Sequence, residues 1–212
     1  MRRYLILYIL ATLLATAPLA AQHNKYDRVR YDQMNEQGIW NVGFSMTPVV
    51  GMIHPTYGKS TGILGFAVEG GYFVADNMRL SLALDFVNDL WANAFPEPGV
   101  YTSEVLSQFK VKVGGHWHMG RWDVGGRLFV GNTTYRYDYN PPIGYVEDDN
   151  FTSYKDRRGL IGVAYEVGYM ISPFFKVGGY FEPSFVFGGG YAQAAGVRLT
   201  IYLPFINMVV CK

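Results

Sequence analysis

Hydrophobic and polar side chains alternate one by one along most of the chain after residue 38. In residues 79–86, for example, Leu80, Leu82, Leu84 and Phe86 fall on one face, whereas the residues between them are Arg, Ser, Ala and Asp. An alternation with a period of two is typical of a β-strand with one apolar face. The same pattern recurs in seven further segments, at about 40–50, 63–74, 109–118, 122–137, 161–171, 174–187 and 197–205. The sequence therefore predicts an all-β protein with eight strands.

The connections between these segments alternate in length. Short turns are expected at 75–77, 119–121 and 172–173, and longer loops at about 51–62, 88–105 and 138–159. The seventh and eighth segments are joined through the three glycines 188–190. This connection is short, although it lies at the end where the other connections are long. Tight and long connections that alternate around an even number of strands are typical of outer-membrane barrels, whose turns are periplasmic and whose loops are extracellular. We therefore expect an eight-stranded antiparallel transmembrane up-and-down β-barrel.

The polar face of the predicted strands carries many charges among small residues. Glycine and alanine are poor choices for the watery face of a strand, but they suit the narrow lumen of an eight-stranded barrel. Unpartnered ions in such a lumen would be costly, so acids and bases should pair. The expected lumen charge network has five acids and six bases: Glu69, Asp85, Asp123, Glu166 and Glu182 with Arg79, Lys110, Lys112, Arg127, Lys176 and Arg198.

Aromatic residues gather near both ends of the predicted strands. Membrane proteins place amphipathic rings at the two membrane–water interfaces, so two aromatic belts are expected. The belt near the short turns would consist of Tyr72, Trp117, Trp122, Tyr169 and Phe175, and the belt near the loops of Phe86, Trp91, Tyr135 and Phe187.

The N-terminus has the pattern of a secretory signal peptide. Two arginines precede an apolar stretch over residues 4–14, and small residues follow before Gln22. The expected organisation is a signal peptide at 1–21, a polar periplasmic lead-in at 22–38, a barrel at 39–205 and a C-terminal tail at 206–212. Half of the 212 residues are hydrophobic, 17% are aromatic and 17% are charged, which excludes a disordered chain. The formal net charge of +1 gives no indication of a nucleic-acid partner.

Over about 39–205 the chain resembles the small eight-stranded outer-membrane β-barrel proteins of the OmpA- and OmpX-like type. The resemblance rests on the signal peptide, the strand count, the alternation of loops and the charged lumen. It implies a location in the bacterial outer membrane, contact with outer-membrane lipid, and folding by the outer-membrane assembly machinery. Substrates of that machinery usually end their last strand in an aromatic residue, and here Phe205 closes the last alternating segment.

The function that the sequence favours is non-enzymatic, structural or surface-binding, and carried by the extracellular loops. In the 88–105 loop, Trp91, Phe95 and Tyr101 form the candidate contact for an extracellular ligand. A narrow channel for small solutes is the first alternative. A lipid-modifying enzyme is a second, which would need His54 to meet a serine such as Ser60 or Ser103. A soluble periplasmic barrel is the alternative fold, because alternation alone does not distinguish it.

One cluster of candidate metal ligands stands out. His116 and His118 flank Trp117, and Asp123 follows across the turn. No further Cys or His lies near them in the sequence, so polar filling of the lumen is favoured over a metal site. We expect no metal and no cofactor.

Overall fold

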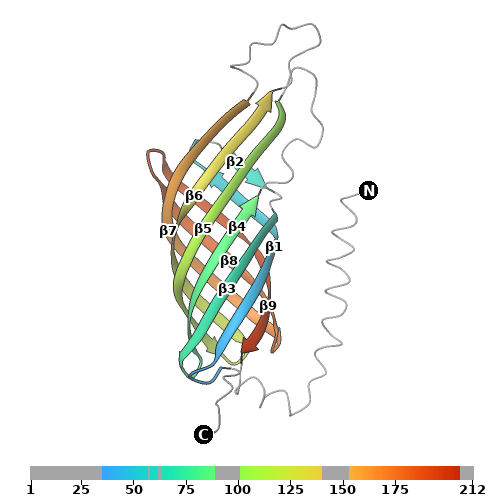
Figure 1. Ribbon diagram of the computed structural model, residues 1–212, viewed down its shortest axis with the longest axis vertical. Coiled ribbons are helices and arrows are strands. Elements are labelled where there is room, and N and C mark those ends of the chain that lie inside the picture. Colours follow the sequence, from blue (N-terminus) through green and yellow to red (C-terminus); the bar gives the residue numbers. More distant parts are fainter. Residues whose placement is uncertain (1–34, 57, 62–63, 89–100, 140–152, 206–212) are drawn as a thin grey trace, which may run out of the picture.

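The computed structural model describes residues 35–56, 58–61, 64–88, 101–139 and 153–205. These form one antiparallel sheet in which strands that follow each other in the chain pair, except that the short strand at 58–61 pairs with the first strand and not with the strand after it. The first and last strands also pair with each other. The pairing of Trp40 with Phe205 begins the seam that closes the sheet into a barrel (Figure 1). The strands are β1 (Trp40–His54), β2 (Gly58–Thr61), β3 (Leu64–Ala75), β4 (Met78–Asn88), β5 (Tyr101–Met119), β6 (Trp122–Tyr139), β7 (Ser153–Ser172), β8 (Phe175–Val186) and β9 (Gly190–Phe205).

Although nine strands are assigned, the wall of the barrel has eight strand positions, because β2 and β3 share one position beside β1. Both strands pair with β1. The first part of β1 pairs with β3, and the last part, toward the loop end, pairs with β2. The register continues unchanged from one to the other, since Gly51 faces Thr61 just as Thr47 faces Gly65. The all-β class, the antiparallel order and the eight-stranded closed barrel are therefore confirmed. In the described part of the chain no helix is long and apolar enough to cross a membrane.

The short turns fall where the sequence predicts them. Asp76 and Asn77 join β3 to β4, and Gly120 and Arg121 join β5 to β6. Asn77 and Gly120 take positive φ angles of 64° and 60°, which these two residue types tolerate in tight turns. Residues 35–38, the last part of the expected lead-in, hydrogen-bond to the β3–β4 turn. The signal peptide and residues 22–34 lie outside the described residues.

The opposite end of the barrel differs from the expectation. The segment 51–62 is no long loop: β1 runs to His54, Pro55 and Thr56 lie in a turn, and β2 begins at Gly58. The loops at 88–105 and 138–159 are shorter than expected, because β5 starts at Tyr101, β6 ends at Tyr139 and β7 starts at Ser153. Above the membrane the outward face need not be apolar, so the strands continue where the sequence alternation fades.

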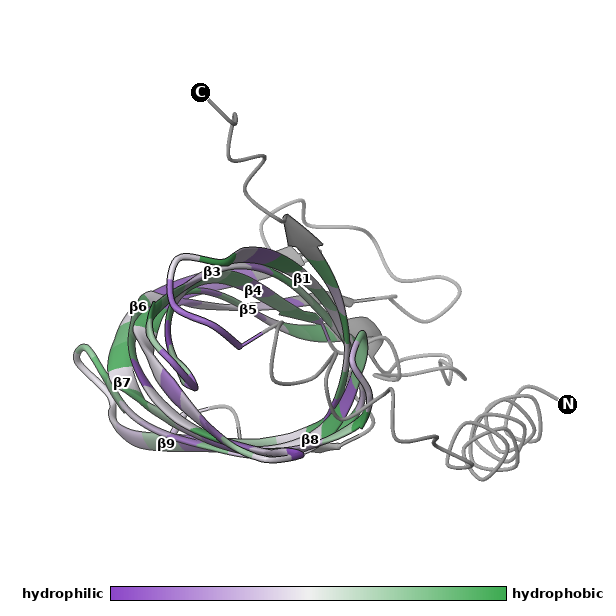
Figure 2. Ribbon diagram, turned by 90° about the horizontal axis from the view of Figure 1, so that it is seen from below, coloured by the Kyte–Doolittle hydropathy of each residue, from purple (hydrophilic) through white to green (hydrophobic). Residues whose placement is uncertain are grey.

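The two faces of the wall differ sharply in burial. Leu80, Leu82 and Leu84 are 55%, 56% and 50% exposed, whereas Glu69 is 3% and Lys112 0% exposed. The strands thus turn their apolar side chains outward and their charged side chains into the lumen. Hydrophilic and hydrophobic colours accordingly alternate along the strands in Figure 2. A water-soluble barrel would have the reverse arrangement, so this inversion favours a barrel that sits in lipid.

Candidate functional site: the lumen and the loop end

All eleven charged residues of the expected lumen network face the interior and take part in ion pairs. The first part of the network is a chain of four residues from four strands. Glu69 of β3 lies 3.0 Å from the Nη1 atom of Arg79 and 2.7 Å from the Nη1 atom of Arg127. Arg127 in turn contacts Glu166 of β7 at 2.5 Å. Arg127 therefore bridges two carboxylates across the lumen.

The chain of ion pairs continues toward the loop end. Arg198 of β9 joins Glu166 at 3.3 Å to Asp85 of β4 at 2.7 Å. Lys112 contacts Asp85 and also Glu182. A final pair connects Glu182 to Lys110 at 2.6 Å. Bases and acids alternate without interruption from Arg79 to Lys110, so every carboxylate in this chain contacts two bases.

A second cluster lies at the turn side of the lumen. Asp123 accepts a hydrogen bond from Lys176 at 2.5 Å and lies 3.0 Å from the Nδ1 atom of His116. His118 is 3.8 Å from the same carboxylate and packs against the Phe73 ring. The described residues include no group of three His, Cys, Asp or Glu side chains arranged to hold a metal ion. Asp123 already binds Lys176, so the geometry here is that of a structural ion pair.

This network ties the barrel together across its axis. The paired residues come from every strand from β3 to β9. Moving an ion out of water costs several kcal/mol, and only close partners offset that cost. The alternation of charge satisfies this condition, because neighbouring like charges are always separated by an opposite one.

Apolar layers cover the charges on the loop side. Val50, Met52, Val87, Leu106 and Ala194 pack together with the ring of Tyr180. The same ring lies 4.6 Å from the guanidinium of Arg198, so it is the boundary between the apolar layer and the ion pairs. A smaller contact between Met170 and Tyr202 lies toward the turns, with Arg79 over the Tyr202 ring at 4.8 Å.

The lumen is thus a filled interior, as expected for an eight-stranded barrel. Solutes that crossed it would have to break ion pairs in the middle and then pass an apolar layer. An apolar constriction of this kind opposes wetting.

The expected aromatic belt near the short turns has outward-facing rings. Trp117 and Trp122 are each more than half exposed, and the Trp122 ring contacts that of Tyr169 at 5.2 Å. Trp40, which the sequence analysis missed, packs on Tyr72 at 4.7 Å. Its position as the first residue of a strand, directly opposite Tyr72 in the register, was the available signal. Phe175 also lies on the outward face of its strand.

The belt near the loops needs one correction. Phe86 and Phe187 face outward, but Tyr135 points inward and packs against the apolar layer around Tyr180. On β6 the outward positions are the even-numbered ones, such as Leu128 and Val130, so Tyr135 has the wrong parity for the belt. Phe86 instead pairs across the sheet with two other outward rings, Phe66 and Phe109. Trp91 lies outside the described residues.

Strands β5, β6 and β7 extend past the other strands at the loop end (Figure 1). The last pairing of β4 is that of Asn88 with Ser107, whereas β5 and β6 remain paired as far as Tyr101 and Tyr139. We call the end of these strands, from the paired residues Gln108, Thr133 and Arg158 outward, the extension; it comprises residues 101–108, 133–139 and 153–158. The segments 89–100 and 140–152 are attached to it in the chain.

The loop end is braced by Arg158, which faces inward on the extension. Its guanidinium contacts Asp156 on the same strand at 2.9 Å. It also donates a hydrogen bond of 3.1 Å to the hydroxyl of Thr56 in the β1–β2 turn. This residue thereby connects the extension to the far side of the barrel mouth.

The remaining sequence candidates belong to the loop end of the barrel, and the structure describes only some of them. Tyr101 is the first residue of β5 and not part of a loop, and Trp91 and Phe95 lie outside the described residues. His54 is buried, and its Nδ1 atom accepts a hydrogen bond from the backbone amide of Thr56 at 3.2 Å. Ser60 lies in β2 and Ser103 in β5.

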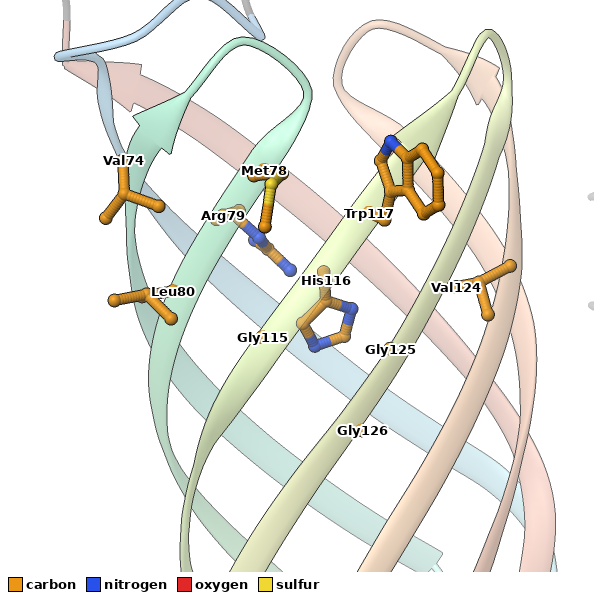
Figure 3. A pocket seen from close by; sticks show the side chains of 10 residues that line it. All are labelled: Val74, Met78, Arg79, Leu80, Gly115, His116, Trp117, Val124, Gly125 and Gly126. Carbon is orange, nitrogen blue, oxygen red and sulfur yellow. The ribbon is translucent and has the colours of Figure 1, made fainter.

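The lipid-facing wall has a depression near the short turns (Figure 3). It has a volume of about 450 Å³, and Met78, Leu80 and Trp117 stand around it. Its floor is flat because β5 and β6 bring Gly115 and Gly126 together there. It opens on the outer face, whose side chains are apolar, and Arg79 and His116 are also among the residues that line it.

No protein-family model and no curated protein sequence shows significant similarity to this chain. Among solved structures, the barrel is similar to Ail, the attachment invasion locus protein of Yersinia pestis, with a TM-score of 0.57 and 11% identity. That match covers 79% of this chain and 99% of Ail. Ail in complex with the heparin analogue sucrose octasulfate matches with a TM-score of 0.56 and 10% identity over the same shares of both chains.

Neisserial surface protein A is also similar, with a TM-score of 0.50 and 9% identity over 80% of this chain and 98% of its own. These likenesses concern the fold. The protein has the architecture of the small eight-stranded outer-membrane β-barrels, and the outward apolar side chains agree with that architecture.

Proposed function

We propose that the protein is a non-enzymatic barrel of the bacterial outer membrane that acts at the cell surface while its lumen stays closed. One observation carries this proposal: the lumen is filled by paired charges and an apolar layer, whereas the strands β5, β6 and β7 project beyond the rest. The projecting strands at the loop end therefore support a binding role there, on the outer side of the membrane.

The extension and the chain attached to it supply the binding surface. Segment 89–100 contains Trp91 and Phe95 next to prolines, a composition suited to gripping a partner. Tyr101 begins β5 directly after this segment, so the strand anchors it. Extracellular ligands would therefore meet a rigid sheet and an aromatic segment together.

The test is adhesion of cells that display the protein. Residues 89–100 are replaced by a Gly/Ser linker of equal length, and binding is measured to immobilised host proteins and to glycans. A sulfated glycan belongs among them, because Ail was solved with a heparin analogue. We expect adhesion to fall to the level of cells without the protein.

A matched control replaces Pro55 of the β1–β2 turn by Ser and leaves Thr56, the partner of Arg158, in place. Adhesion should persist in this control, because the turn lies on the opposite side of the barrel mouth from the extension. Adhesion that survives the replacement of 89–100 would contradict the surface-binding role.

A narrow channel is the second candidate, favoured by the continuous row of charges from Arg79 to Lys110. Recording in planar bilayers distinguishes it from the closed barrel. The proposal predicts no steady conductance steps for the wild-type protein. Regular steps that change size when Tyr180 in the apolar layer is replaced by Ala would establish a channel.

The non-enzymatic part of the proposal rests on the loop-end geometry around His54, whose Nδ1 atom is occupied by a backbone amide. Purified protein in outer-membrane lipid should release no fatty acid. Turnover that disappears in a His54→Ala variant would establish a lipid-modifying enzyme instead.

We also propose that β9 is the strand that the outer-membrane assembly machinery recognises. It ends in the aromatic residue Phe205, which pairs with Trp40 at the seam of the barrel. A Phe205→Ala variant should accumulate unfolded in the periplasm, whereas Phe181→Ala in the middle of β8 should assemble normally.

A further inference from the structure

Two histidines lie in the cluster at the turn side of the lumen, two positions apart on the inward face of β5. His116 is 3% exposed and His118 is 5% exposed. The His118 ring packs against the ring of Phe73 on β3, with 5.4 Å between the ring centroids. We call His116 and His118 the histidine pair.

Hydrogen bonds reach only one of the four ring nitrogens of the pair within the described part of the chain. The Nδ1 atom of His116 lies 3.0 Å from the Oδ1 atom of Asp123. The Nε2 atom of His116 and both ring nitrogens of His118 are buried and have no hydrogen-bond partner among the described residues. The Nε2 atom of His118 is 3.8 Å from the same Oδ1 atom, which is too far for a hydrogen bond. A buried ring without hydrogen bonds carries a charge only at a high cost, because nothing replaces the water that the cation loses.

The charged side chains around the histidine pair already balance one another. Those that face the two rings come from β3, β4, β6, β7 and β8, and they are the acids Glu69, Asp123 and Glu166 and the bases Arg79, Arg127 and Lys176. Tyr202 of β9 adds a phenol, whose ring lies 4.8 Å from the guanidinium of Arg79. With both histidines neutral, three acids therefore face three bases.

The carboxylates nearest to the two rings are occupied by other cations. Asp123 accepts a hydrogen bond from the ammonium group of Lys176 at 2.5 Å. The Oε2 atom of Glu166 lies 4.0 Å from the Nε2 atom of His116, but the same oxygen contacts Arg127 at 2.5 Å. A proton on either ring would thus add a positive charge where the described carboxylates already have partners. Such a charge is costly in a closed lumen.

We propose that the histidine pair makes the turn-side end of the barrel sensitive to acid: the closed barrel holds both rings neutral, and protons that reach them weaken it. An ordinary histidine binds a proton near pH 6.5, so the unfolded chain takes up both protons in mild acid. The folded barrel takes them up only against the cost of burial and the surrounding charges. Protons that the unfolded state binds preferentially lower stability as the pH falls. This inference does not depend on the role of the extension in surface binding.

The test is the equilibrium constant of unfolding in urea, measured by tryptophan fluorescence on the full chain in lipid vesicles at about pH 7.5 and about pH 5.5. Between these values an ordinary histidine goes from about one tenth to about nine tenths protonated. Each histidine that stays neutral in the folded barrel therefore raises the unfolding constant about tenfold. We expect the rise for the wild-type protein to exceed that for the H116Q/H118Q variant by about a hundredfold, with either single variant between them.

The matched control is H54Q, which removes a buried histidine at the loop end of the barrel. In an H54Q background, H116Q/H118Q should reduce the rise by the same factor, because His54 lies at the opposite end of the lumen from the pair. Heat-modifiable migration on gels reports folding. If H116Q/H118Q does not fold, His118→Phe replaces it, since this variant keeps a ring against Phe73 and should reduce the rise about tenfold.

Two results would overturn the proposal. One is an equal rise in the unfolding constant for the wild-type protein and a folded H116Q/H118Q variant. The other is a smaller rise for the wild-type protein than for the variant, which would mean that a protonated His116 strengthens its contact with Asp123. Adhesion of cells does not enter this test, so its failure is distinct from failure of the surface-binding role.

Discussion

At the scale of single residues, the bases of the lumen differ in how many carboxylates they contact. The guanidinium of Arg127 contacts two, those of Glu69 and Glu166. Lys110, at the end of the same chain of ion pairs, contacts Glu182 alone, and that carboxylate also has Lys112. Both bases are fully buried. The cost of losing either one therefore depends on how many carboxylates lose a partner.

We predict that Arg127→Met destabilises the barrel more than Lys110→Met does. Breaking a buried ion pair from one side costs about 3–5 kcal/mol, and Arg127→Met breaks two pairs at once. The measurement is the free energy of unfolding in urea, followed by tryptophan fluorescence. Equal costs for the two single variants would mean that the ion pairs act independently of their place in the network.

Two glycines of the β5–β6 hairpin provide a second contrast between residues. A Cβ on Gly114 would lie 2.1 Å from the carbonyl oxygen of Gly126, whereas a Cβ on Gly126 would have no atom within 4 Å. Gly114 is therefore required by the close approach of the two strands. Gly126 faces the depression on the outer wall, where a side chain would have room, so a glycine is not required there.

We predict that Gly114→Ala destabilises the barrel by about 1–3 kcal/mol or prevents its folding, because the strands must move apart. Gly126→Ala should change stability by no more than about 0.5 kcal/mol. Urea unfolding of the two variants side by side checks this. A reversed order would show that the hairpin is packed differently from the description above.

At the scale of strands, the alternation of side chains predicted most of the barrel because burial in lipid imposes a strict period of two on the outward face. That constraint ends at the membrane surface, which is why the loops were predicted too long. Thr134 and Arg136 are outward residues of a regular strand, yet both are polar. Tyr135 was assigned to the outward belt for the same reason. Without a row of apolar residues, the sequence does not show which residues of the strand point outward and which point inward.

A strand-scale prediction concerns the belt near the short turns. In a Trp91→Phe variant the remaining tryptophans are Trp40, Trp117 and Trp122, all about half exposed on the outward face at that end. In vesicles of brominated phosphatidylcholine, bromine atoms near the headgroup should quench their fluorescence more strongly than bromine atoms near the chain ends. Stronger quenching from the chain ends would place the belt in the membrane interior, and no quenching would indicate a barrel outside the bilayer.

At the scale of the whole molecule, closure of the sheet decides which charges meet. The sequence alone assigns the eleven charged residues to one face, and closure gathers that face around a single axis. The individual pairs were not predictable, because they join strands far apart in the chain, as Arg198 and Asp85 do. Their partners depend on the tilt and stagger of the strands, which one sequence does not reveal. The closed barrel has two different ends, one with tight turns and one with the extension.

These unlike ends predict a fixed orientation in the membrane, with the extension outside the cell. In a Cys211→Ser background, a single cysteine is introduced either at Pro55 in the β1–β2 turn or at Asp76 in the β3–β4 turn, both exposed positions. A membrane-impermeant maleimide should label Pro55→Cys in intact cells and Asp76→Cys only after the outer membrane is permeabilised, because short turns of such barrels face the periplasm. Labelling of Asp76→Cys alone in intact cells would invert the topology. The extension would then face the periplasm, and a role in surface binding would be excluded.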